Sequence, residues 1–477
     1  MQVEDSIRMT VTPVKSQVFQ GYVGKEKAFA KNGKGIFMTI EKNGKEYRDV
    51  IDAVSGAAVA SLGWGDPDVP EIVSEALKKH TYSYPGLVAN EAAEKLAKFY
   101  IDNSPPGAFA SALWTCSGSE SNENALKIIR QYWLEKGQPK KTKVISRECS
   151  YHGFTLGAIS IGNTPRGAPF KDLMINQEEV CLKMPRCWPY RDMKEGETEE
   201  EYSQRLLDVL EKMILDNDPE TVSAVIVETL PGSSIGTPVP SKGYLKGIRD
   251  LCNKYDVVFM LDEVMCGTGR ANPNGKLNCW ENFLAPEDGP DIQTVGKTLG
   301  SGYVTIAGVL ISPKILDAYV NGSGLILGAQ TYHSHAFNCG TALGIQQKIL
   351  KNGLTKNVFE NGNLLGKKLQ EALLDDPNNF VGDVRGLGGF WTIEFVKDKK
   401  TKEPFPPEKK VGPRFSDIAL ENGFNIMGVS GADNYGGNWD IALFGPSFII
   451  TKEEVDLLVE RVVSAVHDLT KQLRAEA

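Results

Sequence analysis

Asp262 and Lys297 are the residues whose types and surroundings best suit a shared chemical site. Asp262 closes the apolar run 257–261, which is typical of a parallel strand buried on both faces. Open α/β sheets place their ligands at the carboxyl ends of such strands. Lys297 lies in the small-residue loop 296–302. A desolvated lysine amine has a lowered pKa and can act as a nucleophile and then as a proton shuttle. Considered singly, Asp262 could instead be a solvated strand end, and Lys297 could be a surface charge.

The segment 117–124 is a second place with chemical potential. It reads Ser-Gly-Ser-Glu-Ser-Asn-Glu-Asn and leads into apolar positions with helical spacing, which predicts a helix start. Backbone N–H groups at a helix start lie at the positive end of the helix dipole and can hold a phosphate. The same pattern also suits an N-capping serine followed by a glutamate. Both roles are compatible with one helix.

These segments resemble the class III (ω-) aminotransferases, fold-type I enzymes that use pyridoxal phosphate. The matches are DEVMCGTGR at 262–270, PDIQTVGK at 290–297 and SGSESNENALKIIR at 117–130. The corresponding family motifs are DEVxxGxGR, PDIxxxxK and SGSExxExAxKxxR. The resemblance implies that Lys297 forms the Schiff base with the cofactor aldehyde. It also implies that Asp262 pairs with the pyridine nitrogen and keeps it protonated.

The resemblance extends to further cofactor contacts. In the family's [FY]HG segment the aromatic residue stacks on the pyridine ring, which gives that role to Tyr151. The segment 330–336 resembles FTYSGHP, whose threonine reaches across a dimer interface to the partner's cofactor. We therefore expect a homodimer, or a dimer of dimers, in which Thr331 completes the partner's site. The cofactor-binding residues implied in this way are Gly118, Ser119, Tyr151, Glu228, Asp262, Val264, Lys297 and Thr331.

Trp64, Phe154 and Arg385 are the expected substrate contacts. Trp64 stands where the family often has His, and packing is its alternative role. Phe154 stands where members that process ornithine, acetylornithine or 4-aminobutyrate usually carry an arginine that grips a carboxylate, so it argues against those substrates. Arg385 matches the family's VRGxGL arginine, and Ser233 replaces the glutamate that usually locks it. An unlocked Arg385 could fold in for a keto acid and swing out for an apolar or cationic amine; a structural arginine is the alternative.

The implied reaction is a ping-pong transamination from an amine or ω-amino acid to a small 2-oxo acid, with pyruvate as the expected acceptor. Racemases, aminomutases and decarboxylases on the same fold share the cofactor residues and stay open. The segment 232–236 fits the G-x-S-x-G elbow of serine hydrolases, but prolines at 231, 238 and 240 remove its strand–turn–helix context. Neither 300–302 nor 386–389 completes a dinucleotide-binding motif.

The composition limits which binding partners and which cellular compartment are expected. A net charge of −8 over 477 residues argues against nucleic acid or an anionic membrane as a partner. The 8 cysteines form no C-x-x-C pair, which favours free thiols in a reducing compartment. Residues 1–20 lack the apolar core of a signal peptide, and no apolar run is long enough to span a membrane, so we expect a cytoplasmic protein. His333 and His335 lack a third ligand, so no metal is expected.

The length of 477 residues predicts more than one domain. The resemblance implies an α/β, fold-type I architecture in which a large domain has a mostly parallel central sheet flanked by helices. The expected division is an N-terminal segment at 1–65, a large cofactor-binding domain at 66–340 and a C-terminal part of the small domain at 341–477. Predicted strands are 35–40, 47–52, 143–148, 222–227, 257–261, 307–312, 390–396 and 424–428. Predicted helices are 69–79, 92–100, 341–351, 357–374 and 452–474, with a surface insertion at 185–205.

Overall fold

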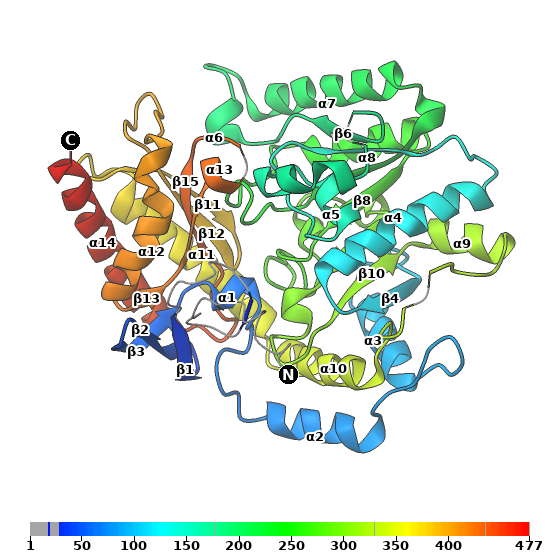
Figure 1. Ribbon diagram of the computed structural model, residues 1–477, viewed down its shortest axis with the longest axis horizontal. Helices are drawn as coiled ribbons and strands as arrows, with labels where there is room; N and C mark the ends of the chain where they lie inside the picture. The colour runs from blue at the N-terminus through cyan, green and yellow to red at the C-terminus, as the bar shows by residue number, and fades with distance from the viewer. Residues whose placement is uncertain (1–17, 20–27, 177, 329, 435, 477) are drawn as a thin grey trace, which may run out of the picture.

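The computed structural model describes residues 18–19, 28–176, 178–328, 330–434 and 436–476. Its centre is a seven-stranded sheet that is parallel except for one strand, β10, which runs antiparallel to both its neighbours. Helices cover both faces of this sheet (Figure 1). The sheet order is β4 (Ser111–Thr115), β10 (Ala307–Ile311), β9 (Ile292–Val295), β8 (Val258–Asp262), β7 (Val222–Glu228), β5 (Lys143–Arg147) and β6 (Cys181–Met184).

The two faces of the central sheet separate because successive strand residues point to opposite sides. In β7, Val225 and Val227 belong to one buried cluster, and Ala224 and Ile226 belong to another. The first cluster includes helices α3 (Glu91–Asp102), α7 (Glu199–Asp216), α8 (Tyr244–Lys254) and α10 (Ala336–Lys351). The second includes α4 (Gly118–Glu135) and α9 (Pro313–Asn321). Burial on both faces explains why these strands are continuous apolar runs.

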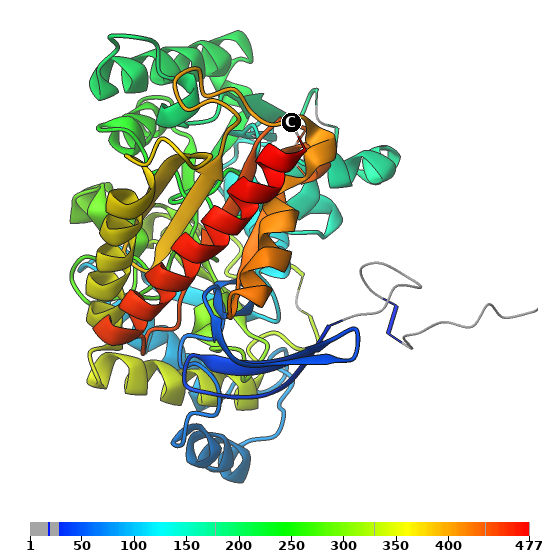
Figure 2. The same cartoon turned by 90° about the vertical axis from the view of Figure 1, so that its left-hand side faces the viewer.

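A smaller α/β layer joins the two ends of the chain. The N-terminal hairpin pairs in parallel with a C-terminal strand, since Ile51 lies opposite Phe424 (Figure 2). That sheet has the order β1 (Phe29–Lys34), β2 (Phe37–Lys42), β3 (Lys45–Asp52) and β13 (Phe424–Asn425). The neighbouring sheet has the order β11 (Val381–Leu387), β12 (Phe390–Phe395), β15 (Asp440–Phe444) and β14 (Met427–Ser430). Their shared core includes α11 (Leu354–Leu373), α12 (Val411–Glu421) and α14 (Lys452–Ala475).

The remaining helices lie along the connections. They are α1 (Ser55–Ala58), α2 (Val69–Lys79), α5 (Leu156–Ile161), α6 (Pro189–Asp192) and α13 (Gly431–Asn434). Two 3-10 helices matter for the site, η1 (Pro165–Leu173) and η5 (Lys297–Leu299). Among the described residues, no helix is both long and apolar enough to cross a membrane.

Most predicted elements are present, including the strands at 35–40 and 47–52, which pair as β2 and β3, and the helix 69–79. The prediction of one strand at 424–428 is wrong. The segment divides at Ile426, which contributes to the buried core, and its halves β13 and β14 join different sheets. The segment 185–205, predicted as a surface insertion, carries buried side chains at Cys187 and Trp188, and its acidic part begins the long helix α7 with a capping box of Thr198 and Glu201.

Candidate active site

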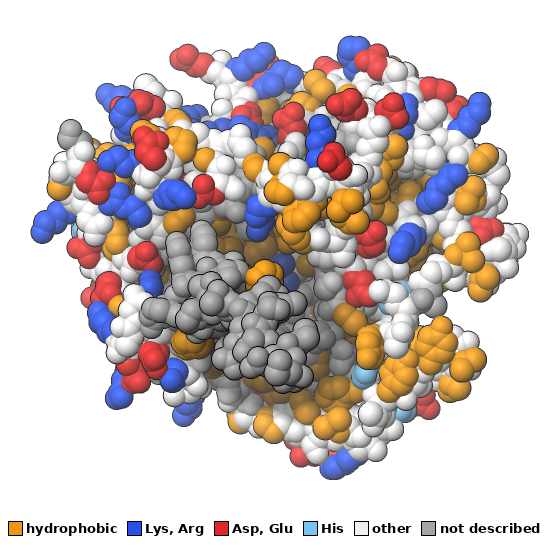
Figure 3. Space-filling view, in the orientation of Figure 1, with side chains coloured by type: hydrophobic (Ala, Val, Ile, Leu, Met, Phe, Trp, Pro, Cys, Tyr) orange, Lys and Arg blue, Asp and Glu red, His pale blue; other side chains and the backbone are white. Residues whose placement is uncertain are grey.

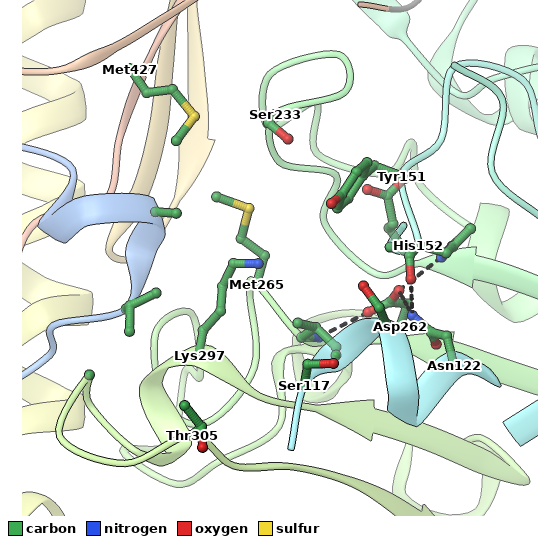
Figure 4. Close-up of a pocket in the computed structure, with 18 of the residues that line it drawn as sticks. Ser117, Asn122, Tyr151, His152, Ser233, Asp262, Met265, Lys297, Thr305 and Met427 are labelled. Atoms are coloured by element: carbon green, nitrogen blue, oxygen red, sulfur yellow. Dashed lines mark hydrogen bonds and ion pairs between the residues drawn. The ribbon is translucent and has the colours of Figure 1, made fainter. Parts of the chain in front are cut away.

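A cavity of about 620 Å³ opens at the carboxyl ends of the central strands. It lies where the start of α4, the ends of β7 and β8, and the loop around η5 meet β14 of the smaller layer (Figure 4). Strand order explains the meeting, because β7 and β8 are neighbours and place Glu228 directly opposite Asp262. The predicted acid and lysine both line this cavity, as do Gly118, Ser119, Tyr151, Glu228 and Val264.

Asp262 is fixed by donors from three separate elements. Its Oδ2 contacts Nδ1 of His152 at 2.8 Å and accepts from Nδ2 of Asn122 at 2.9 Å. Its Oδ1 accepts from the Val264 N–H at 3.0 Å. Burial alone would raise the pKa of Asp262, but its bonds to His152, Val264 and Asn122 outweigh this and hold the pKa below its ordinary value. The carboxylate therefore stays ionised inside the fold.

Lys297 is held in an unusual conformation at the start of η5. Its φ is +47°, a left-handed value that costs a non-glycine residue on the order of 1–2 kcal/mol. Such strain is typical of functional positions. Burial lowers the pKa of the Lys297 amine, although Asp262 and Glu228 oppose the shift. A lowered pKa keeps more of the amine unprotonated near neutral pH, as nucleophilic and proton-transfer chemistry requires.

The start of α4 forms one wall of the cavity. Ser117 is the N-cap, and its Oγ accepts from the Glu120 N–H at 3.2 Å, so the capping role is confirmed. Gly118 and Ser119 follow in the first turn, where backbone N–H groups lack intrahelical acceptors. A Cβ at Gly118 would come within 2.6 Å of a Val264 methyl group, so only glycine fits. The phosphate-binding role of this turn stays a prediction.

Tyr151 and Glu228 complete the cavity's polar side. Tyr151 lies beside His152 at the cavity wall (Figure 4). Burial raises the pKa of Glu228 above its ordinary value, against the opposing charges of His152 and Arg147. The Ser234 hydroxyl donates to Glu228 Oε1 at 3.4 Å. Glu228 is thus a buried acid whose neighbours come from several segments.

None of the three expected substrate residues is among the described residues that line the cavity. Trp64 packs on the N-terminal hairpin, where its N–H and C=O pair with Gly35. Phe154 is 46% exposed and its backbone N–H donates to Ser119 Oγ at 3.0 Å. Their roles toward a substrate stay predictions, but the structure gives both a packing or scaffolding role.

Arg385 is locked, so the expectation of an unlocked guanidinium is wrong for this structure. Its Nη1 contacts Asp383 at 2.7 Å and Glu394 at 2.6 Å. Its Nε and Nη2 donate to the carbonyls of Gly236 and Ile235. The prediction of an unlocked Arg385 rested only on the absence of a glutamate at position 233. The actual partners come from β11 itself, from β12 and from backbone carbonyls, which a family motif does not reveal.

Several cavity residues were missed by sequence reasoning. Asn122 lies inside the 117–130 motif but was not predicted to line the cavity, yet its buried amide donates to Asp262 and to the His152 carbonyl at 2.6 Å. The sequence signal for Asn122 was a polar residue one helical turn after Ser119, on the face of α4 that points toward the end of β8. Met265 and Met427 give the cavity an apolar side (Figure 4). Arg166 also lines it, although no motif marks that position.

The residues present fit pyridoxal phosphate. An ionised buried acid, an amine of lowered pKa and the first turn of α4 lie in one cavity. Close packing at Gly153 supports this, because a Cβ there would meet Ser119 Oγ at 2.5 Å. The donors that could hold a phosphate are the first-turn N–H groups and the hydroxyls of Ser117, Ser119 and Thr305.

Comparisons with known proteins agree with this geometry. The family model "Aminotransferase class-III" matches residues 21–466. An uncharacterized aminotransferase of Schizosaccharomyces pombe is 38% identical over 91% of each chain. The diaminobutyrate–2-oxoglutarate transaminase of Halomonas elongata is 34% identical over 93% of this chain and 91% of its own. The ω-transaminase of Pseudomonas jessenii, solved with PMP, superposes with a TM-score of 0.83 at 29% identity over 94% of this chain and 93% of its own.

Proposed function

Since this chain belongs to the class III aminotransferases, we propose that it moves an amino group from an amine or ω-amino acid to a small 2-oxo acid, with pyruvate as acceptor, in a ping-pong cycle. Enzymes of this family use pyridoxal phosphate, and the P. jessenii relative was solved with the aminated form of that cofactor. The observation that carries the proposal is the amine of Lys297 in one cavity with the ionised Asp262.

The side chains divide the chemical work. The bound cofactor would supply an electron sink for the bond that breaks at the amine-bearing carbon. Asp262, with its pKa held low, keeps a negative charge that would pair with the ring nitrogen of the bound cofactor. Lys297, with its lowered pKa, accepts a proton from the substrate carbon and later returns one. The aromatic face of Tyr151 is available for stacking at the cavity wall.

The shape of the cavity supports an amine with an apolar chain. Beside its polar side, the wall includes an apolar group of residues: Ala57, Val59, Leu230, Met265, Met427 and Val429. Methionine side chains adapt to differently shaped apolar groups. Relatives named for gamma-aminobutyrate, in Solanum lycopersicum, and for diaminobutyrate support a substrate whose amine lies at the end of a chain.

We propose that the enzyme is a homodimer or dimer of dimers in which Thr331 contacts the partner's cofactor. Thr331 is exposed and, among the described residues, is not part of its own chain's cavity wall. Its carbonyl accepts from the Tyr82 hydroxyl at 2.8 Å. Hydrophobic side chains gather on this face over the loop between α2 and α3 (Figure 3), and exposed ones nearby include Tyr82, Tyr84, Leu87, Val88 and Tyr332. Partners normally bury such a patch.

A cytoplasmic location is also part of the proposal. All eight cysteines are free, and six of them are buried. Free thiols are typical of proteins from reducing compartments.

The test is the visible spectrum of the purified holoenzyme with a panel of amines and no acceptor. A transaminase should convert one equivalent of its cofactor to the aminated form and stop, and pyruvate should restore the original spectrum. A racemase, aminomutase or decarboxylase would instead continue to turn over without an acceptor. Lys297→Ala should lose the visible absorption band of the bound cofactor, and borohydride should no longer trap the cofactor on the protein. An unchanged band and unchanged trapping would refute the assignment of Lys297.

A further inference from the structure

Arg166 lies at the cavity wall on a segment that no family motif singles out. It is the second residue of η1, and its side chain is exposed. Its guanidinium centre lies 5.5 Å from the ring centre of Tyr151 and 6.0 Å from that of Phe154. Cation–π contacts at these distances orient a guanidinium against the rings while its N–H edges stay available for hydrogen bonds.

Charge at the cavity makes Arg166 distinctive. Among the described residues that line it, the basic side chains are His152, Arg166 and Lys297; His152 contacts Asp262, and Lys297 faces Asp262 and Glu228. Arg166 contacts aromatic rings and, within the described part of the chain, forms no ion pair with a carboxylate. Its charge is therefore available to an anionic ligand.

The other arginines near the site are already engaged. Arg385 is bound by Asp383 and Glu394, as well as by backbone carbonyls. Arg147 is buried, and its Nη2 donates to the Glu228 carbonyl at 2.6 Å. Withdrawing either one would leave a buried carboxylate or carbonyl without its donor, which is costly. Arg166 can bind a ligand without breaking any such contact.

We propose that Arg166 binds the carboxylate of the 2-oxo acid and of any ω-amino acid donor; this rests on the proposed transaminase function. Two parallel N–H groups of a guanidinium match a carboxylate in a bidentate pair. The apolar end of the substrate then lies toward Met265 and Met427, since Tyr151 lies on the side of the cavity opposite Met427 (Figure 4).

Exposure of Arg166 also explains how one site serves acids and plain amines. When the substrate has no carboxylate, an exposed guanidinium stays hydrated, so no buried charge is left unpaired. This removes the need for an arginine that swings between two positions. Carboxylate binding at such a site should also weaken with added salt, because exposed charges are screened.

The experiment compares matched substrates in single half-reactions of the holoenzyme. Pyruvate is paired with acetone, and β-alanine with propylamine, so that in each pair a methyl group replaces the carboxylate. The variants are Arg166→Gln, Arg166→Lys and the control Lys171→Gln, which removes the same charge from the same 3-10 helix at an exposed position outside the cavity wall. A second readout is the dissociation constant of propionate, an unreactive carboxylate. It is measured from the change that propionate causes in the absorption spectrum of the cofactor.

In Arg166→Gln, the binding of propionate and the half-reactions of pyruvate and β-alanine should weaken by about 10- to 100-fold, the range for losing a charge-assisted hydrogen-bonded pair. The reactions of acetone and propylamine should change by less than about threefold. The losses in Arg166→Lys should be smaller than those in Arg166→Gln, and Lys171→Gln should resemble the wild type. Equal losses for charged and uncharged members, or no loss of propionate binding, would overturn the assignment. If the wild type itself reacts with no amine in any panel, the proposed transaminase function fails instead.

Discussion

The Arg385→Met variant should unfold more readily than the wild type, because the small layer is destabilised. Both half-reactions should be affected alike. Arg385 is 9% exposed and bridges Asp383 and Glu394, of which Glu394 is fully buried. Removing one partner of a buried ion pair costs about 3–5 kcal/mol, because a charge is left uncompensated. Arg191 Nε still donates to Glu394 at 2.6 Å and compensates part of that charge. We therefore expect the low end, about 3 kcal/mol of unfolding free energy.

The assay is urea unfolding at one fixed protein concentration, since an oligomer's stability depends on that concentration. A double-mutant cycle with Glu394→Gln isolates the pair. The double variant should be more stable than the sum of the single losses predicts, by at least about 1 kcal/mol, because neither charge is then buried alone. The same proteins are tested in the pyruvate and amine half-reactions.

One result would refute this reasoning. If Arg385→Met changed the unfolding free energy by less than about 0.5 kcal/mol, the range of ordinary surface substitutions, and slowed only the 2-oxo-acid half-reaction, Arg385 would be a substrate residue. The locked arrangement with Asp383 and Glu394 would then not be the one that binds the acceptor.

Three further predictions concern other parts of the molecule. Asp262→Asn should lower kcat/KM by about 100-fold or more through loss of a preorganised charge, and a steady-state loss below threefold would argue against its role. Gly153→Ala should weaken cofactor binding by about tenfold, measured by absorbance titration of the apoprotein, because φ is +126° and a Cβ would lie 2.6 Å from Ser119 Cα; an unchanged affinity would separate Ser119 from the cofactor. Burial raises the pKa of Asp440 to about 6, so the native state holds its proton longer than the unfolded chain and stability falls by up to about 3 kcal/mol as pH rises from 4 to 6. Asp440→Asn, which still accepts from the Gly412 N–H, should lack that fall in urea titrations, and an identical pH profile would contradict the shift.

The placement of Asp262 and Lys297 could be predicted because each depends on local sequence. A buried apolar run ends at Asp262, and the tight loop at Lys297 follows the next strand of the same sheet, β9. Parallel neighbours end at one edge, so both side chains reach one cavity. The Ser117 cap was predictable for the same reason, since its acceptor and donor lie three residues apart.

The substrate side could not be predicted, because its contacts join segments far apart in the chain. The partner that locks Arg385, Glu394, comes from the neighbouring strand β12. The register of β11 and β12, which no motif encodes, fixes that pairing. Likewise, the 424–428 run has one hydrophobic pattern but supplies strands to two sheets. Only the assembled small layer decides where it divides.

The site combines a fixed interior with an adjustable rim. Asp262 is held by bonds from α4, from the segment after β5 and from the backbone N–H of Val264, so three separate parts of the chain fix it. The residues that would choose the substrate lie on peripheral elements instead: Arg166 on an exposed 3-10 helix and Met427 on β14 of the small layer. Substitutions at the rim break no buried hydrogen bond of the acid. We therefore expect substitutions at Arg166 and Met427 to change substrate preference while leaving the contacts of Asp262 and Lys297 in place.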